Sequence, residues 1–267
     1  MKKYLSFFRM RLIAGLQYRA AALAGLSTQF VWGCMEILLY RAFWRECPER
    51  FPMGQEALSA YIWLQQALLN VFALWYWEQD LIESVRDGTV AYELTRPVNL
   101  YGMWMARTVA MRLSRAALRC WPILLVAALI PRPYGLRVRI GLPVFLLFLI
   151  SLGLMLAVVC GFVLVTYALS FHLVDTNGFR VLSVAAADLL GGGIVPLPFL
   201  PEPLRSLASF SPFGSMQNVP LRIFGGDLTG KDCFQAVALQ AFWAVTLIGL
   251  GIILTDSGVR KAEIAGG

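Results

Sequence analysis

Charged residues and histidine are scarce in this sequence. Asp, Glu, Lys and Arg make up 15% of its 267 residues, whereas they make up about 25% of an average soluble protein. His172 is the only histidine, so the sequence has no histidine cluster for a metal site or a proton relay. No nucleophile, histidine and acid form a recognisable catalytic set either. We therefore predict that this chain has no catalytic site and no metal site of its own.

Long runs without any charge are the most informative feature that is present. Residues 57–77 and 141–171 contain no charged side chain, and apolar residues make up 58% of the chain. As a helix, residues 141–171 would extend about 46 Å, which exceeds the roughly 30 Å hydrocarbon core of a bilayer. These runs predict an integral membrane protein. The net charge of +7 then reflects cations retained on the cytoplasmic side rather than binding to nucleic acid.

The hydrophobic pattern predicts an all-α, polytopic membrane protein with six transmembrane helices. Leu5, Phe8, Leu12 and Leu16 recur at helical spacing among the cations of residues 1–19, so we expect an amphipathic helix in the cytoplasmic interface there. Residues 78–102 form the largest predicted cytoplasmic connection. The distribution of Lys and Arg favours cytoplasmic N- and C-termini. The predicted spans are residues 20–44, 57–77, 103–130, 141–171, 181–200 and 233–255.

Glycine and proline break the predicted fifth span near its end. Gly191, Gly192, Gly193, Pro196 and Pro198 leave backbone groups unpaired, which a membrane tolerates only where protein or water surrounds them. The stretch that follows, 201–232, is too apolar for a free outer loop. We expect short re-entrant helices that dip into the outer leaflet, and a loop packed on top of the bundle is the alternative.

Several polar residues fall inside the predicted spans and are candidate pathway residues. The arginines of the third span share one helical face and could line a path for anionic substrates, although such arginines more often reach headgroups or pair with acids of a neighbouring helix. Asp188 is an intramembrane acid with either a functional role or a structural hydrogen bond. The whole set is Gln65, Gln66, Asn70, Arg112, Arg115, Arg119 and Asp188.

The connection 78–102 is compact and charged. Residues 78–86 have the composition of a short helix, Asp87-Gly88 is a turn signal, and Arg96-Pro97 breaks the backbone again. It is either a solvated loop or a docking surface for a cytoplasmic partner. Residues 225–232 nearly match a phosphate-binding loop, but Asp232 stands where Ser or Thr should hold magnesium, so we predict no nucleotide site.

The five cysteines suggest no cofactor. They have no metal-ligand spacing and their number is odd. Cys34, Cys120 and Cys160 lie in apolar stretches, where cysteine packs as a small hydrophobic residue. Cys47 and Cys233 are both expected outside, and a disulfide between them stays open.

Three motifs in order along the chain resemble the permease subunits of ABC type-2 exporters, most closely a bacterial branch related to viologen-type and multidrug exporters. The first motif is IESVRDG followed by ELTRPVN, in the predicted cytoplasmic connection. The second is the Pro- and Gly-rich stretch after the fifth span, and the third is the tail. Their positions are 82–88 and 93–99; 196–201, 211–213 and 220–226; and 258–261 with Gly266-Gly267.

The resemblance implies a mechanism that composition alone does not give. Two permeases, identical or different, form a pathway at their interface in the bacterial cytoplasmic (inner) membrane, and a pair of ABC ATP-binding subunits docks beneath them. ATP and Mg²⁺ are bound by the partner subunits, so the chain itself is not an enzyme. The coupling surface for those subunits would include Glu83, Arg86, Asp87, Arg96 and Pro97.

Two other functions stay open from the residues. An ion-coupled secondary transporter would use Asp188 and the polar residues Gln65, Gln66 and Asn70, although no inverted repeat is visible. A non-transporting membrane scaffold is the second alternative. The identity of the substrate is not encoded in any motif, and export as the direction of transport comes from the resemblance.

Overall fold

The computed structural model describes residues 2–17, 19–136 and 141–261, and the side chains of residues 19–24 are outside that description. Residues 137–140, between the predicted third and fourth spans, and Gly266-Gly267 of the tail motif therefore lie outside the described residues. The described part of the chain is all-helical and contains no strand. Its helices are α1 (Lys2–Leu16), α2 (Arg19–Glu46), η1 (Pro48–Arg50), α3 (Gln55–Phe72), α4 (Gln79–Arg86), α5 (Ala91–Leu94), α6 (Leu100–Leu129), α7 (Leu142–Leu169), α8 (Asn177–Leu190), η2 (Leu197–Phe199), α9 (Glu202–Phe210), α10 (Asn218–Gly225) and α11 (Gly230–Lys261).

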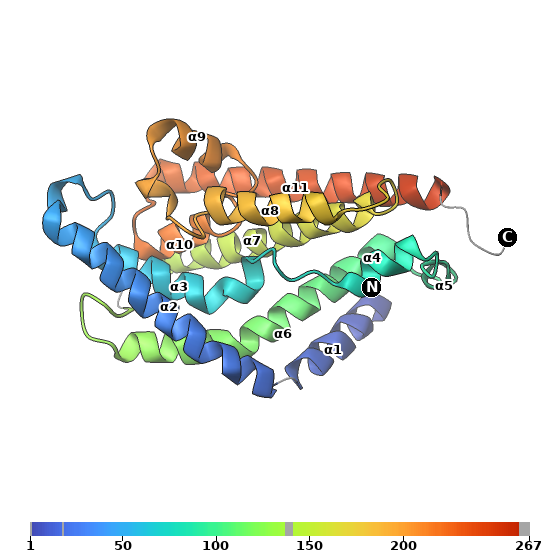
Figure 1. Cartoon of the computed structure of the whole chain (residues 1–267), viewed down its shortest axis with the longest axis horizontal. Helices are drawn as coiled ribbons and strands as arrows, with labels where there is room; N and C mark the ends of the chain where they lie inside the picture. Colours follow the sequence, from blue (N-terminus) through green and yellow to red (C-terminus); the bar gives the residue numbers. More distant parts are fainter. Residues whose placement is uncertain (1, 18, 137–140, 262–267) are drawn as a thin grey trace.

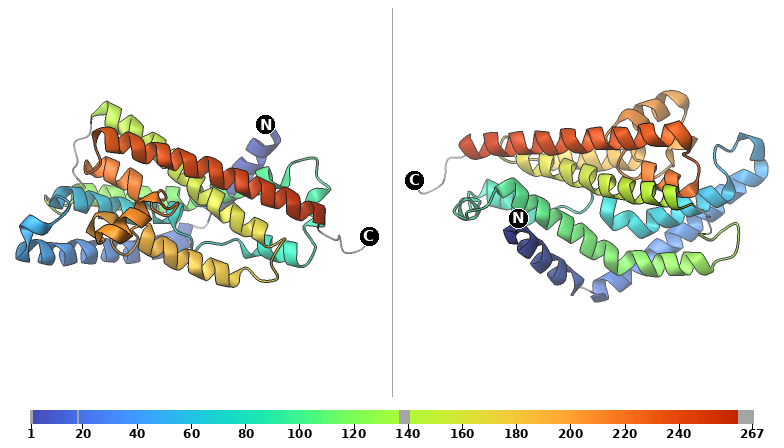
Figure 2. Two further views of the ribbon diagram at one scale, coloured as in Figure 1. Left: turned by 90° about the horizontal axis from the view of Figure 1, so that it is seen from above. Right: turned by 180° about the vertical axis from the view of Figure 1, so that it is seen from behind.

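The long helices form an elongated bundle. In Figure 1, α11 runs along α7, and α2, α3 and α6 lie below them. The N-terminus, α4, α5 and the end of α11 gather at one end, whereas η1, α9 and α10 lie towards the other. Figure 2 shows α1 packed alongside α6, apart from the other long helices. The connection between α3 and α6 is therefore next to the N-terminal helix.

The core of the bundle is built around α3 and the second half of α7. Nearly every residue of α3 from Leu58 onwards is buried, and α7 is buried throughout from Val158 to Ala168. The first ten residues of the α7 region, 141–150, are mostly exposed. Because α7 is apolar all round, its exposed half needs lipid or another protein to cover it.

Two of the described helices, α7 and α11, are long and apolar enough to cross a membrane by length and composition. The helices α2, α3 and α6 also fall on predicted spans but carry more polar residues. The predicted second span, 57–77, differs from the structure because α3 ends at Phe72. Residues 73–77 follow the helix in an irregular conformation.

The predicted fifth span also differs from a continuous helix. At 14 residues, α8 extends about 21 Å, and it ends at Leu190, where the glycines begin. A side chain at Gly191 would place its Cβ 2.4 Å from the carbonyl oxygen of Ala187, and Gly192 has φ +85°. The chain then turns through η2 into α9. The glycines thus end α8 as the sequence indicated.

The two helices that follow pack differently. Helix α10 lies against α3 and α7, and its Leu221 and Ile223 are fully buried. Helix α9 leaves Leu207 62% and Phe210 70% exposed.

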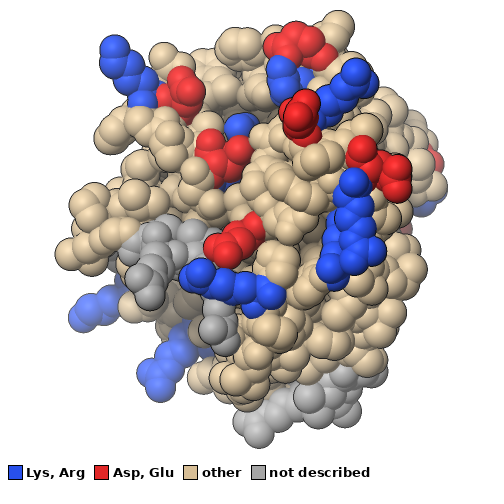
Figure 3. All heavy atoms as spheres, turned by 90° about the vertical axis from the view of Figure 1, so that its left-hand side faces the viewer, with Lys and Arg blue, Asp and Glu red and all other residues tan. Residues whose placement is uncertain are grey.

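The end of the molecule that carries η1 and α9 has side chains of both charges on its surface (Figure 3). Many of them form ion pairs. Arg205 pairs with Glu202, Arg222 Nε lies 2.5 Å from Asp227 Oδ2, and Arg132 Nε lies 3.7 Å from Glu56 Oε1. This pairing leaves no single-sign field over the described residues at this end.

Candidate functional site

The connection between α3 and α6 begins with an irregular segment, residues 73–78, which we call the strap. Arg112 of α6 is fully buried, and its Nη1 donates hydrogen bonds to the carbonyl oxygens of Val71 (2.7 Å) and Ala73 (2.9 Å). These bonds satisfy carbonyls at the end of α3 that would otherwise lack partners. The helix can therefore stop at Phe72 inside the protein, and the strap leaves it towards α4.

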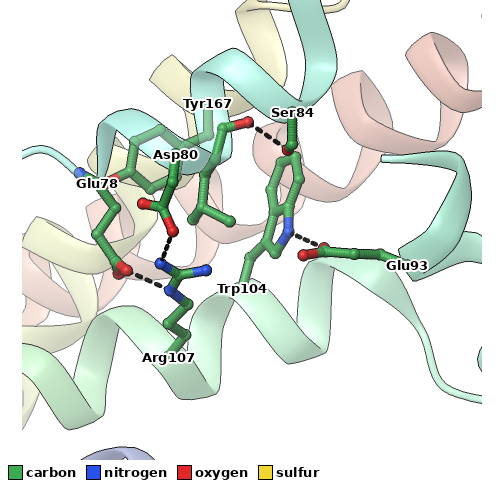
Figure 4. Close-up of polar contacts among 8 residues, drawn as sticks. Glu78, Asp80, Ser84, Glu93, Trp104, Arg107 and Tyr167 are labelled. Carbon is green, nitrogen blue, oxygen red and sulfur yellow. Dashed lines mark hydrogen bonds and ion pairs between the residues drawn. The ribbon is translucent and has the colours of Figure 1, made fainter. Parts of the chain in front are cut away.

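The beginning of α4 is anchored to α6 and α7 (Figure 4). Arg107 of α6 forms ion pairs with Glu78 and Asp80. The backbone N–H of Glu78 donates a 2.8 Å hydrogen bond to the hydroxyl of Tyr167 on α7. Both Arg107 and Glu78 have side chains only 12% exposed, whereas Asp80 is 65% exposed. The Arg107–Glu78 pair is therefore the contact that fixes this end of the connection.

Burial raises the pKa of Glu78, and the guanidinium of Arg107 offsets part of that rise. A carboxylate in this position is tolerated because Arg107 and the start of the helix lie beside it. Loss of Arg107 would leave a buried acid without its cation.

The far side of the connection is anchored through α5. Trp104 Nε1 of α6 donates a 2.8 Å hydrogen bond to Glu93 Oε2 (Figure 4), and the ring of Trp104 is 1% exposed. Between α4 and α5 the chain turns at Gly88, whose φ is +74°, as the Asp87-Gly88 turn signal predicted. Both ends of the connection are thus tied to the same face of α6.

The residues predicted for the coupling surface all lie on this anchored connection and are exposed. Glu83 and Arg86 belong to α4, and Asp87 follows it directly. Arg96 and Pro97 lie after α5. The set is Glu83, Arg86, Asp87, Arg96 and Pro97, and none of these side chains is buried.

Helix α1 is attached to the same connection. Lys3 Nζ donates to the carbonyl oxygen of Pro97 (3.4 Å), and the hydroxyl of Tyr4 accepts from the backbone N–H of Asn99 (2.9 Å). A cleft of about 280 Å³ opens beside α4, between Ile82, Val85 and Arg86 on one side and residues 170–176 on the other. The structure thereby brings the N-terminal helix and the predicted coupling residues to one end of the bundle.

A protein-family model described as "ABC-2 family transporter protein" matches residues 26–266. The chain belongs to the ABC-2 transporter family. Membership confirms the resemblance to ABC type-2 permeases, whereas the match does not distinguish the viologen and multidrug branch. No curated protein and no solved structure matches the chain.

Family membership fixes the general role of the chain. An ABC-2 family member is the membrane permease of an ABC exporter, a transport component rather than an enzyme, and works with an ATP-binding partner. The described residues include no group of three or more His, Cys, Asp or Glu side chains able to hold a metal ion. The thiols of Cys47 and Cys233 are free, the first exposed and the second buried.

In this ABC-2 transporter the polar residues of α3 hold other parts of the protein. Gln65 Nε2 donates to the carbonyl oxygens of Gly193 (2.8 Å) and Gly192 (3.4 Å), at the break after α8. Gln66 Nε2 donates to Glu36 Oε2 of α2 (3.3 Å). Asn70 is buried, and its Nδ2 has no hydrogen-bond partner among the described residues.

The three arginines predicted on one face of the third span have three different surroundings. Arg112 caps α3, as described above. The guanidinium of Arg115 lies 4.6 Å from the ring centroid of Tyr76 in the strap. Arg119 is half-buried and packs against Gly25 of α2. Arg112 and Arg115 thus contact backbone carbonyls and an aromatic ring, and a role of the three arginines in an anionic path stays a prediction.

Asp188 lies on an open groove beside the strap. Its Oδ2 accepts a 3.2 Å hydrogen bond from Trp75 Nε1. The groove encloses about 750 Å³ and is lined by Trp75, Trp77, Arg180, Val184, Asp188 and Ile194, among others. A tryptophan at the end of an uncharged run such as 57–77 is typical of a membrane interface, so the sequence carries no signal for this bond.

The anchors Arg107, Trp104 and Tyr167 were also not singled out from the sequence. Trp104 and Arg107 are three residues apart, which puts them on one face of a helix. The connection 78–102 carries acids that need cations nearby. The spacing of Trp104 and Arg107 on one helical face is therefore the signal in the sequence that points to these anchors.

Proposed function

We propose that this chain is one of the paired permease subunits of an ATP-driven exporter in the bacterial cytoplasmic membrane, with its termini on the cytoplasmic side. In this proposal the six spans are α2, α3, α6, α7, α8 together with the chain that follows it as far as Leu200, and α11, and α9 and α10 are the re-entrant outer helices. The burial of Leu221 and Ile223 of α10 against α3 and α7 supports a segment that packs into the bundle, as re-entrant helices require.

The transport pathway would lie at the interface of two permeases, which are identical or different. Large apolar side chains of α2 and α8 are exposed and need a bilayer or a second subunit to cover them. On α2 these are Val31, Trp32, Met35, Leu38, Leu39 and Phe43, and on α8 they are Val181, Leu182 and Leu189.

The ATP-binding subunit would dock on α4, α5 and the residues that follow. One observation carries this assignment: exposed charges lie on a connection whose two ends are anchored by buried partners on α6 and α7. A mobile loop would absorb a push from a partner, whereas an anchored one transmits it to the bundle. The cleft beside Arg86 offers a shaped contact for such a partner.

The test is a charge reversal at the centre of the proposed surface. The double variant Arg86→Glu/Asp87→Arg should lose the ATP-binding protein that co-purifies with the wild-type permease from mildly solubilised membranes. Both side chains are exposed, so the permease should still fold. Glu49→Arg/Arg50→Glu is the matched control, because it reverses an exposed, adjacent pair at the opposite end of the bundle.

Mass spectrometry of the co-purified proteins and their ATP hydrolysis give the result. Equal recovery of an ATP-binding protein with both double variants would contradict the docking assignment. If no ATP-binding protein accompanies the wild type in several detergents, the ion-coupled alternative gains support. Asp188→Asn would then be the severe substitution.

A further inference from the structure

The strap is held by α6 and α7 along its whole length. Arg112 binds the carbonyl of Ala73 at its beginning, Arg115 lies over the ring of Tyr76, and Tyr167 accepts from the backbone of Glu78 at its end. Because Arg112 and Tyr167 are fully buried, the contacts at the two ends of the strap are shielded from water and resist rupture. The strap therefore moves together with α6 and α7.

On its other side the strap reaches α8 through two tryptophans. Trp75 Nε1 donates to Asp188 Oδ2, and the guanidinium of Arg180 lies 5.2 Å from the ring centroid of Trp77. Arg180 Nη1 also donates a 3.1 Å hydrogen bond to Gln79 Oε1, the first residue of α4. The connection between α3 and α6 is thus linked directly to α8.

Asp188 in turn holds the break that follows α8. Its backbone carbonyl oxygen accepts from the N–H groups of Gly193 and Ile194, both at 3.0 Å. From the opposite side, Tyr61 and Gln65 of α3 donate to the carbonyl of Gly192. A displacement of Asp188 would therefore act directly on residues 191–194.

The bond between Trp75 and Asp188 differs from the anchors on α6 in one respect. The Trp75 side chain is 50% exposed and lines an open groove. Where this groove faces the proposed pathway between two permeases, water can replace each partner when the bond breaks, so the cost is small compared with the loss of a buried hydrogen bond. This link can open and close while the strap remains fixed to α6, and it is the switchable contact of the set.

We propose that the strap transmits movement of the α4–α5 connection to the break after α8, with Trp75 and Asp188 as positioning residues for that step. The inference rests on the proposed function, since the movement is supplied by the docked ATP-binding subunit. In the nucleotide-free complex the bond holds α8 against the strap. When nucleotide changes the position of α4, the bond changes with it and residues 191–194 rearrange.

The experiment measures this rearrangement without knowledge of the cargo. A single cysteine replaces Ile194, which is 62% exposed, in a background where the five native cysteines are substituted. The permease is purified with its ATP-binding subunit, and labelling by a water-soluble maleimide is timed without nucleotide and after trapping with ATP and vanadate. The ratio of the two rates reports transmission, and the nucleotide-free rate reports the local fold.

In the otherwise wild-type complex the ratio should differ from one by at least about fivefold, the lower range of allosteric coupling. Trp75→Phe removes the N–H donor and keeps the ring, and Asp188→Leu removes the acceptor; both should bring the ratio close to one with the ATP-binding subunit still bound. Asp188→Asn retains an oxygen acceptor and should preserve the ratio. Trp121→Phe, at a 64% exposed tryptophan of α6, is the matched control.

Two results overturn the strap's role. One is an unchanged ratio in Trp75→Phe and Asp188→Leu, and the other is no nucleotide effect in a complex that hydrolyses ATP. If Trp75→Phe does not fold, Asp188→Leu gives the answer. Failure of any ATP-binding subunit to accompany the wild type is a separate outcome, because it contradicts the proposed function itself.

Discussion

Replacement of Arg107 by methionine should release the coupling connection from the bundle. Arg107 and Glu78 have side chains only 12% exposed, so the substitution leaves a buried carboxylate without its cation. Breaking a fully buried pair in this way costs about 3–5 kcal/mol. The remaining exposure and the ability of Glu78 to take up a proton reduce this to about 2–3 kcal/mol. The lost pair with Asp80 adds less than about 1 kcal/mol, because Asp80 is mostly exposed.

The destabilisation should be local, since α4 and α5 contribute little to the core. Amide hydrogen exchange of residues 79–98 measures it, and the expected increase is about 30- to 150-fold at about 1.4 kcal/mol per tenfold. Peptides from α3 and from the buried half of α7 should exchange as in the wild type. Arg96→Met is the control, because it removes an exposed cation from the same connection and should change stability by less than about 0.5 kcal/mol.

The double variant Arg107→Met/Glu78→Gln separates the loss of the ion pair from the cost of a buried Glu78 carboxylate without its cation. It removes the stranded charge as well as the pair, so it should recover most of the lost protection. Exchange as fast in the double variant as in Arg107→Met would refute the stranded-carboxylate argument. Wild-type exchange in Arg107→Met would refute the anchoring itself.

Two further substitutions test other contacts. Gly192→Ala should lower the free energy of unfolding by about 1–2 kcal/mol, because Gly192 has φ +85° and the new Cβ would lie 2.7 Å from the hydroxyl of Tyr61. Gly178→Ala is the control, because its Cβ meets nothing within 4 Å. Equal melting temperatures for the two variants would contradict the predicted strain at Gly192. Glu78→Gln should flatten the pH dependence of thermal stability. In the wild type the pKa of Glu78 is raised above its ordinary 4.5, so the folded state binds more protons than the unfolded state. Stability therefore falls as the pH rises from about 4.5 through the raised pKa. An equal fall of stability in Glu78→Gln over the same pH range would assign the pH dependence to another group.

Local sequence features predicted the helices and their ends more reliably than the contacts between them. The uncharged run at 141–171 predicted α7, and the glycines at 191–193 predicted the end of α8, because both signals act within a few residues. The end of α3 at Phe72 had no such local signal. It depends on a hydrogen-bond donor, Arg112, that lies 41 residues after Val71 in the sequence.

The candidate site likewise combines features that the local sequence predicts with contacts that only the fold creates. The charged turn at Asp87-Gly88 could be found from the sequence, and Asp87 is exposed in the structure. The partners that anchor this turn could not be found from the sequence, because nothing there distinguishes Arg107 from the neighbouring cations near the start of the predicted third span. Trp75 is separated from Asp188 by 113 residues, and only the folded chain shows that its indole N–H donates to that carboxylate.

The hydrogen bonds of Gln65 also constrain how the protein is made. Gln65 satisfies the carbonyl of Gly192, which is synthesised 127 residues later, a delay of roughly 6–25 seconds at about 5–20 residues per second. During that interval α3 carries polar groups without their final partners, so its own hydrophobicity holds it weakly in a bilayer. We expect α3 to remain beside α2 or within the insertion machinery until α8 emerges. Biogenesis of the bundle would then be completed from its C-terminal half, with α3 among the last helices to leave the translocon.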